Sequence, residues 1–275
     1  MSDPFGYVLS SVVTDRGLVR ATNEDSFLAL PDAGVFVVAD GMGGGEKGEE
    51  ASRWVVEEIE AALRDSQGEL PGVRLMALDE AVNRSSRRII EEARRQGYAQ
   101  MGSTVAALLL DPWHAVSPCV AHVGDSRVYR WRDGTLTPLT ADHTVGNEIL
   151  RRTGDTSFAD ARLSRLSHVL TRTIGMAERV PVEWSAFDLA IDDRLLLCTD
   201  GFTTLLEDAR LCGLLSSSSS PQDACARLAS AVRSVGAVDN YTAVVLFVKD
   251  PLPAPVSHGA DDEEENDYLM RRLRP

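Results

Sequence analysis

The strongest constraint on the fold is the continuous apolar run Val35–Ala39, which ends at Asp40. A strand with one face in water alternates apolar and polar side chains, whereas this run places apolar side chains on both faces. The run is therefore too continuous for a surface strand, and it predicts a strand that is buried within the protein.

The spacing of apolar residues changes from that of strands to that of helices after this run. From Glu46 onwards, Ala51, Trp54 and Ile59 share one helical face. A second helix is predicted over roughly Val73–Gln96, where apolar residues recur at a similar spacing. We expect both helices to pack on a sheet.

Strands return in quick succession after Ser103, and Arg132–Thr135 carries a tight-turn signal between two of them. This order is typical of antiparallel sheet rather than of repeated βαβ units. The stretch Asp142–Ser167 is predicted as a partly helical excursion, Ser216–Ser220 as a loop and Ala224–Val232 as a short helix. The expected strands are Tyr7–Val13, Ser26–Leu30, Val35–Ala39, Thr104–Leu110, Cys119–Val123, Arg127–Trp131, Leu136–Leu139, Leu195–Cys198 and Ala243–Val248.

Length and composition favour one domain with a tail. The chain has 275 residues, of which 44% are hydrophobic, and we expect a domain over residues 1–250 and a tail over residues 251–275. The N-terminus has no secretory signal, and no window approaches the roughly 20 apolar residues that cross a bilayer. We therefore predict a cytoplasmic monomer with no membrane association.

Charge and cysteine usage exclude two further classes. The formal net charge of −14 argues against a nucleic-acid-binding protein, whose footprint is a basic face. The four cysteines are scattered without a Cys-x-x-Cys pair, so neither a zinc site nor a disulfide framework is indicated. An acidic chain that handles phosphate would need local positive charge, which metal ions held by carboxylates could supply.

The tail changes composition after Lys249. Prolines are followed by the acidic run Asp261–Glu265 and by the basic end Arg271–Arg274. Such a segment cannot bury enough apolar surface to fold alone, so we expect it to be disordered. The alternative is a docking segment for a partner, carried by Tyr268–Met270.

Carboxylates gather near the ends of predicted strands. An aspartate at such a place is by itself most simply a turn former or a helix cap. Several together favour a different reading, because Mg²⁺ and Mn²⁺ prefer oxygen ligands that converge from separate segments. An adjoining glycine would let the backbone approach an ion and offer its carbonyl. The four aspartates are Asp40, Asp125, Asp200 and Asp239, and glycines adjoin the first three.

The glycine-rich turn after Asp40 has a rival interpretation. Gly43-x-Gly45-x-x-Gly48 formally fits a dinucleotide-binding loop. The surrounding pattern is not a parallel βαβ series, and no Gly-Lys-Ser/Thr appears, so we disfavour nucleotide binding.

Near the start of the chain, Arg20 precedes the acidic pair Glu24 and Asp25. A guanidinium can grip phosphate oxygens, and adjacent carboxylates can orient metal-bound water. The simpler alternative is a surface arginine beside a polar turn.

Seven ordered motifs resemble those of the metal-dependent type-2C protein phosphatases, the PPM family, over about Tyr7 to Val248. The Asp-Gly-Met-Gly-Gly form is similar to the bacterial branch, whose members typically oppose eukaryotic-like Ser/Thr kinases. The motifs are Thr14-Asp15-x-Gly17-x-x-Arg20-x-x-Asn23-Glu24-Asp25, Asp40-Gly41-Met42-Gly43-Gly44, Gly102-Ser103-Thr104, Gly124-Asp125-Ser126-Arg127, Asp142-His143-Thr144, Thr199-Asp200-Gly201 and Asp239-Asn240-x-Thr242.

The resemblance implies an α+β fold, with a central sandwich of two antiparallel β-sheets flanked by α-helices in four αββα layers. The metal site would lie at one edge of the sandwich. The segment 142–167 would correspond to the variable flap of the family, which shapes substrate access.

The resemblance also implies a ligand set for Mn²⁺ or Mg²⁺. Asp40 would bridge two ions, and the Gly41 carbonyl, Asp200 and Asp239 would complete their protein ligands. Asp125, together with Asp200, would bind a third and weaker ion.

Catalytic roles follow from the same resemblance. Glu24 and Asp25 would act mainly through metal-bound water, and Arg20 would hold the substrate phosphate. A hydroxide bridging two metals would attack the phosphorus of phosphoserine or phosphothreonine in proteins. Eukaryotic members carry a histidine, the proposed acid for the leaving group, where this chain has Met42. His143 is one candidate for that acid, although in the family it looks structural.

Two alternative functions remain at this stage. A regulatory phosphoprotein-binding module with little turnover would be signalled by loss of Asp40, Asp200 or Asp239, and none is lost. A phosphatase of anti-sigma-factor antagonists commonly carries sensor domains and diverges at the arginine motif. The sequence has neither feature, so we favour the protein phosphatase.

Overall fold

The computed structural model describes residues 8–43, 46–67, 69, 71–111, 117–153 and 166–249. The expected tail, Tyr7 and residues 154–165 of the expected flap lie outside these ranges. No helix within them has both the length and the apolar character needed to cross a membrane.

The described strands form two sheets in which all paired neighbours are antiparallel. The first sheet has the order β1 (Val8–Asp15), β11 (Tyr241–Val248), β10 (Arg194–Cys198), β7 (Arg127–Arg132) and β8 (Thr135–Pro138). The second has the order β2 (Asp25–Leu30), β3 (Val35–Met42), β5 (Val105–Leu109), β6 (Cys119–Val123) and β9 (Glu183–Ala186), and β4 (Gly102–Ser103) pairs with β3.

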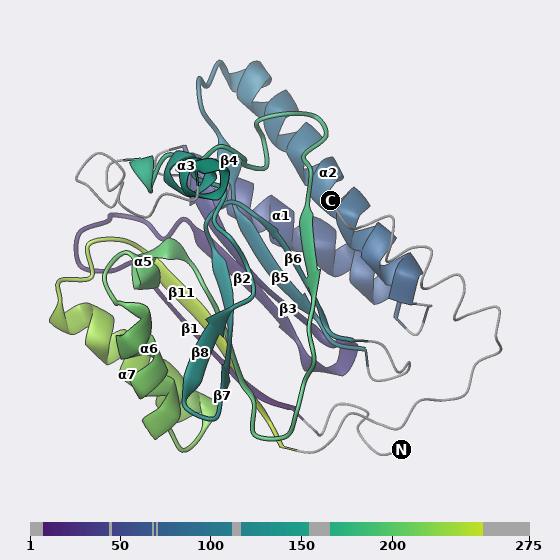
Figure 1. The fold of residues 1–275 in the computed structure, drawn as a ribbon. Coiled ribbons are helices and arrows are strands. Elements are labelled where there is room, and N and C mark those ends of the chain that lie inside the picture. The colour runs from purple at the N-terminus through teal and green to yellow at the C-terminus, as the bar shows by residue number, and fades with distance from the viewer. Residues whose placement is uncertain are drawn as a thin grey trace.

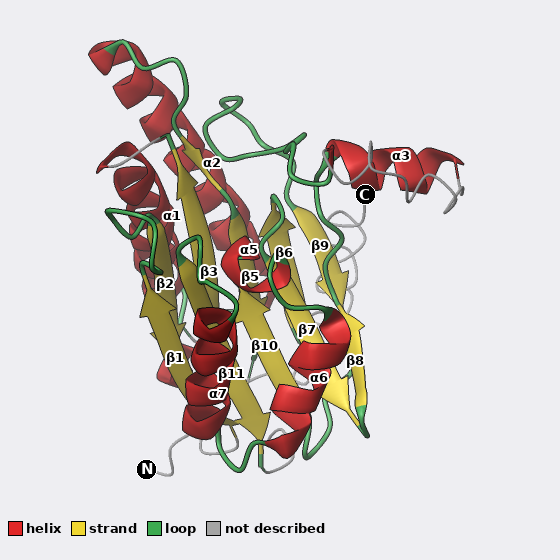
Figure 2. Cartoon of the chain, turned by 90° about the vertical axis from the view of Figure 1, so that its left-hand side faces the viewer, coloured by secondary structure: helices red, strands yellow, loops and turns green. Residues whose placement is uncertain are grey.

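Helices cover the outer face of each sheet, as Figures 1 and 2 show from two directions. The long helices α1 (Glu46–Asp65) and α2 (Pro71–Gln96) lie on the second sheet, and α6 (Asp208–Ser217) and α7 (Pro221–Ser234) lie on the first. The predicted αββα sandwich is therefore confirmed. The structure also contains the short 3-10 helix η1 (Pro31–Ala33) and the helices α3 (Val145–Thr153) and α5 (Asp200–Thr203).

Strand β3 shows why the run Val35–Ala39 must be apolar throughout. Val35, Val37 and Ala39 face α1 and α2, whereas Phe36 and Val38 face the layer between the sheets. All five residues are buried, and each fully buried Val or Phe stabilises the fold by roughly 1.5–3 kcal/mol.

Several predicted strand boundaries differ from the structure by one to three residues, and two of these differences lie beside the aspartate that ends the apolar run. Strand β3 continues past Asp40 to Met42, because Met42 pairs with Gly102 of β4. The expected strand Thr104–Leu110 is interrupted at Thr104, whose N–H and hydroxyl both bond the backbone of Asp40 instead.

Sequence patterns missed β9, α5 and α6, and the serine run is only partly a loop. Ser216 and Ser217 belong to α6. Ser220 caps α7, since its hydroxyl oxygen accepts a hydrogen bond from the Asp223 N–H at 3.1 Å. The two predicted long helices and the turn at Asp133 and Gly134, where φ is 49° and 82°, agree with the structure.

Candidate metal and phosphate site

The predicted site residues meet at one end of the sandwich, around a cavity of about 310 Å³. Asp25 lies directly opposite Asp40 across the β2–β3 pair, 8% exposed. The predicted residues that line the cavity are Arg20, Glu24, Asp40, Gly41, Asp125, Asp200 and Asp239.

The position of Asp40 is fixed by hydrogen bonds between its backbone and Thr104. Its N–H donates to Thr104 Oγ1 at 3.0 Å, and its carbonyl accepts from the Thr104 N–H at 2.9 Å. The next residue must be glycine, because a Cβ on Gly41 would lie 1.9 Å from the Gly48 carbonyl oxygen. Close packing against α1 therefore determines where Asp40 sits.

Asp200 and Asp239 come from neighbouring strand ends. Strands β10 and β11 are antiparallel, so the end of β10 lies beside the beginning of β11. Asp200 opens α5, and a Cβ on Gly201 would lie 1.9 Å from the Asn240 carbonyl oxygen. Only a glycine lets these two segments approach so closely.

Asn240 is a positioning residue to which the sequence analysis assigned no role. Its Oδ1 accepts from the Glu24 N–H at 2.9 Å, and its Nδ2 donates to the carbonyls of Arg16 and Thr22 at 2.9 and 2.8 Å. One amide thus ties the loop that carries Arg20 and Glu24 to the segment that carries Asp239. The motif contained Asn240, but only the tertiary contacts reveal its task.

Asp25 lies beneath the cavity with one oxygen satisfied. Thr199 Oγ1 donates to Asp25 Oδ2 at 2.9 Å, whereas Oδ1 is buried without a hydrogen-bond partner among the described residues. Burial, opposed by its hydroxyl contacts, raises the pKa of Asp25 to about 7.

Burial raises the pKa of three further carboxyl groups, those of Asp40, Asp125 and Asp200. Burial, then the charges of Asp25 and Asp200, raises the pKa of Asp40 well above its ordinary value. Burial, then Asp200, raises the pKa of Asp125 to about 7. Burial, then the charge of Asp239, also raises the pKa of Asp200.

These features fit hard divalent cations. The cavity offers several carboxylate oxygens and a glycine backbone, and beneath it lies a buried oxygen without a partner. Oxygen donors of this kind suit Mg²⁺ or Mn²⁺, whose positive charge would offset the mutual repulsion.

Arg20 provides a cation at the cavity wall. Its Nη2 donates to Asp239 Oδ2 at 2.7 Å, and its side chain is 51% exposed. The hydrogen bond to Asp239 raises the pKa of Arg20. The guanidinium therefore stays charged, and its exposed part is available to an anion in the cavity.

His168 was missed by the sequence analysis. It lines the cavity together with Met42 and Leu170. His168 directly follows the polar excursion 142–167, in a stretch where no periodicity distinguishes it.

His143, a candidate acid, does not line the cavity among the described residues. Its Nδ1 accepts from the Gly124 N–H at 3.0 Å, which leaves the proton on Nε2, facing Glu183 at 3.1 Å. His122 stacks on the ring, and the Arg172 guanidinium lies 3.1 Å from Nε2. The cluster of His122, His143 and Glu183 is therefore a structural network, because a cation already sits where a metal would have to bind.

Comparison with known proteins agrees with this geometry. The family model described as protein phosphatase 2C matches residues 19–238. The chain belongs to the protein phosphatase 2C family. A relative in this family is the serine/threonine phosphatase stp of Listeria welshimeri, 31% identical over 85% of this chain and 93% of that protein.

Solved structures of protein phosphatase 2C relatives share the fold. PppA, described as a key regulatory component of T6SS in Pseudomonas aeruginosa, has a TM-score of 0.77 at 31% identity and covers 88% of this chain and 98% of its own. The catalytic domain of the serine threonine protein phosphatase PstP, in complex with two manganese ions, has a TM-score of 0.74 at 30% identity and covers 88% and 99%.

Proposed function

We propose that this chain is a metal-dependent protein serine/threonine phosphatase that hydrolyses phosphoserine and phosphothreonine in proteins, reversing a Ser/Thr kinase. The observation that carries the proposal is the convergence of Asp40, Asp125, Asp200 and Asp239 around one cavity that also holds Arg20. Carboxylates alone would repel a phosphate, and divalent cations bound between the carboxylates and the phosphate would remove that repulsion.

The proposed ligands are the side chains of Asp40, Asp200 and Asp239 and the Gly41 carbonyl for two Mn²⁺ or Mg²⁺ ions, and Asp125 with Asp200 for a third. Such ions supply Lewis acidity, which lowers the pKa of water and neutralises charge on phosphoryl oxygens. The protein holds these donors rigidly before any ligand enters, through Thr104, Gly201 and Asn240.

Arg20 is proposed to bind two phosphoryl oxygens, and Asp239 orients its guanidinium through the 2.7 Å hydrogen bond. Glu24 and Asp25 are proposed to accept hydrogen bonds from water and so to orient it for attack in line with the leaving oxygen.

Water is favoured as the nucleophile because no serine or cysteine lines the cavity in the part of the chain that the structure describes, and the Thr104 hydroxyl, which does line it, is engaged with the Asp40 N–H and Ser126 Oγ. Ser126 Oγ is bonded to Thr104 Oγ1 at 2.7 Å. Cys198 is fully buried, and burial raises the pKa of its thiol to about 12.

The proposal is tested by hydrolysis of a phosphothreonine peptide with Mn²⁺, with Mg²⁺ and with excess EDTA. We expect phosphate release with metal and none with chelator. Equal release with EDTA, or binding of metal without any turnover, would overturn the proposal; the second result would favour a regulatory phosphoprotein-binding module.

A further inference from the structure

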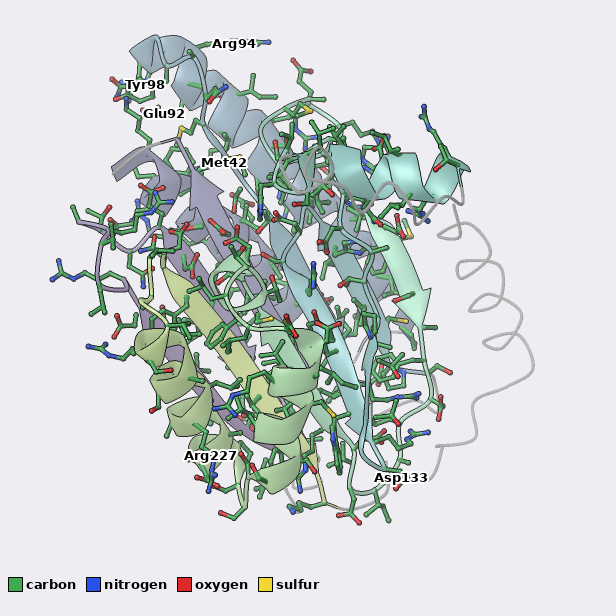
Figure 3. All side chains as sticks on the ribbon, turned by 60° about the vertical axis from the view of Figure 1, so that its left-hand side comes forward. Met42, Glu92, Arg94, Tyr98, Asp133 and Arg227 are labelled. Carbon is green, nitrogen blue, oxygen red and sulfur yellow. The ribbon has the colours of Figure 1, made fainter. Side chains whose placement is uncertain are left out.

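A second cavity of about 550 Å³ adjoins the cavity lined by Asp40, Asp200 and Asp239, which we call the catalytic cavity. We call it the adjoining groove; its walls are the end of α2 near Ile90 and Arg94, the segment Tyr98–Gly102, and the segment from Leu170 to Glu178. Met42, Gly43 and Leu170 line both cavities, so the two cavities share one wall. Figure 3 labels Met42, Arg94 and Tyr98 at this end of the molecule.

We propose that the adjoining groove binds the substrate polypeptide beside the phosphorylated residue and accepts an apolar side chain. The inference rests on the proposed phosphatase function. A polypeptide whose phosphate lies in the catalytic cavity can leave it across Met42 and Leu170. An extended chain advances by ~3.4 Å per residue, so residues one to three positions from the phosphorylated residue reach the groove.

The chemistry of the groove favours an apolar occupant. Met42, Met101 and Met176 line it together with Ile90 and Leu170. Met176 is 60% exposed, so its side chain is accessible to a polypeptide that enters the groove. Methionine adapts its shape to different apolar side chains, and this suits an enzyme with more than one substrate.

The groove is formed before a ligand arrives. Ser103 and Ile174 exchange two backbone hydrogen bonds of 3.0 and 2.9 Å. Ser86 Oγ, on α2, donates to the Ala177 carbonyl and accepts from the Gly175 N–H at 2.9 Å. The segment that carries Met176 is thus fastened both to β4 and to α2, which lowers the ordering cost of binding.

The rim of the groove is polar. Tyr98, which lines the groove, has Lys47 Nζ 3.4 Å from the centre of its ring. Arg94 and Glu178 form an ion pair of 3.9 Å, with side chains 74% and 68% exposed. The groove thus combines apolar side chains with charged side chains of both signs, as protein recognition sites do, which distinguishes it from the acidic catalytic cavity.

The first test uses phosphothreonine heptapeptides with alanine at all other positions. Leucine or aspartate then replaces alanine at each of the three positions on either side of the phosphothreonine. We expect wild-type protein with Mn²⁺ to show, at one or more positions, a kcat/KM at least tenfold higher for leucine than for aspartate. Hydrolysis of p-nitrophenyl phosphate, which has no flanking residues, is measured in parallel.

The second test compares two neutral substitutions of exposed methionines. Met176→Gln should reduce the leucine-to-aspartate ratio at least threefold. Met76→Gln should leave it unchanged, since Met76 is 54% exposed on α2 but lies about 20 Å from the groove end of that helix. Fluorescence anisotropy with a non-hydrolysable phosphonate peptide that carries leucine should show a lower affinity for the Met176→Gln protein and an unchanged affinity for the Met76→Gln protein.

Several results would overturn the inference. Equal rates for leucine and aspartate peptides, or a preference that survives Met176→Gln, would exclude the groove while leaving the phosphatase function intact. Absence of hydrolysis of both peptides and p-nitrophenyl phosphate would overturn the function and the groove together. A wild-type dimer that Met176→Gln converts to a monomer, seen by gel filtration, would assign the groove to a second copy of the chain.

Discussion

Strands β7 and β10 lie side by side, and carboxyl groups at the two ends of this strand pair have opposite pKa shifts. We call the end at the cavity lined by Asp125 and Asp200 the catalytic end. At the catalytic end, burial raises the pKa of Asp125 to about 7 and also raises that of Asp200. At the other end, hydrogen bonds from Arg132 and then Arg130 lower the pKa of Asp188 to about 2. Figure 3 labels Asp133, in the turn after β7, at this second end, far from Met42.

At the end opposite the catalytic end, Arg132 and Asp193 form a structural ion pair, which we call the clamp. Arg132 Nε and Nη2 donate to the two oxygens of Asp193 at 2.6 Å each, and Arg132 Nη1 also meets Asp188. Asp193 is fully buried and accepts a further bond from the Ala190 N–H at 2.9 Å. Every oxygen of this carboxylate therefore has a donor.

The comparison shows what distinguishes a functional cluster from a structural one. The same residue type stabilises the fold where arginines meet it and costs stability where carboxylates face one another. The catalytic end leaves its charges to be neutralised by protons or by cations from solution, which a merely structural cluster would not need.

The largest expected effect is loss of activity on removing one carboxylate from the catalytic end. Asp40→Asn keeps the shape but removes a proposed metal ligand, and we expect kcat with Mn²⁺ to fall by about 10³-fold or more. The folded protein should persist, and its melting temperature in EDTA at pH 8 should rise, because the substitution removes one buried carboxyl whose negative charge is opposed by burial and by Asp25 and Asp200. Steady-state kinetics and calorimetry measure both; normal turnover, or an unfolded variant, would contradict the assignment.

Arg20→Ala tests the cation of the catalytic end. Charge-assisted hydrogen bonds contribute about 1.5–3 kcal/mol, so KM for a phosphothreonine peptide should rise about ten- to hundredfold, with a smaller change in kcat. Arg132→Ala, at the other end, is the matched control and should leave KM unchanged. An unaltered KM for the Arg20 variant would refute its phosphate role.

Asp193→Ala tests the clamp. The change leaves Arg132 without its main partner, and we expect a loss of about 2 kcal/mol, below the cost for a fully buried pair because Arg132 is 29% exposed. The melting temperature should fall by about 6 °C while kcat stays within twofold. A large loss of activity in the folded variant would show that the two ends are coupled.

The smallest expected effect is the pH dependence of the metal-free protein. The folded-state pKa values of Asp25 and Asp125, about 7, exceed the unfolded values near 4, so the folded state holds more protons in the range between. Their stabilisation is therefore present at low pH and is lost as pH rises through about 7. From pH 6.5 to 8 in EDTA, the free energy of unfolding should fall by about 1 kcal/mol.

The buried His122 and His143, whose pKa values are lowered, act in the opposite direction in the lower part of this window, and the net fall of about 1 kcal/mol includes their effect. With saturating Mn²⁺ the trend should reverse, because metal binding competes with protons and strengthens as pH rises. Thermal melts at several pH values, with and without Mn²⁺, measure both slopes. A flat profile in EDTA would contradict the raised pKa values.

Much of the fold was predictable because burial imposes a local pattern. The continuous run Val35–Ala39 and the helical spacing of α1 and α2 follow from which faces are covered, and the turn at Asp133 and Gly134 follows from local backbone preference. Short or polar elements such as β9 and α5 carry too little periodicity, and only their neighbours stabilise them. Strand β3 passes through Asp40 and Gly41 because β4 pairs with it, which no local signal indicates.

The amino-acid pattern alone showed that acidic residues and an arginine recur beside strand ends, and that family motifs stand in order around them. The folded structure was needed to show that Asp25 faces Asp40, that Asn240 joins two distant loops, and that His168 reaches the same cavity. The physical reason is that side-chain type and period are local properties, whereas convergence, desolvation and mutual repulsion depend on segments more than 200 residues apart, such as Glu24 and Asn240.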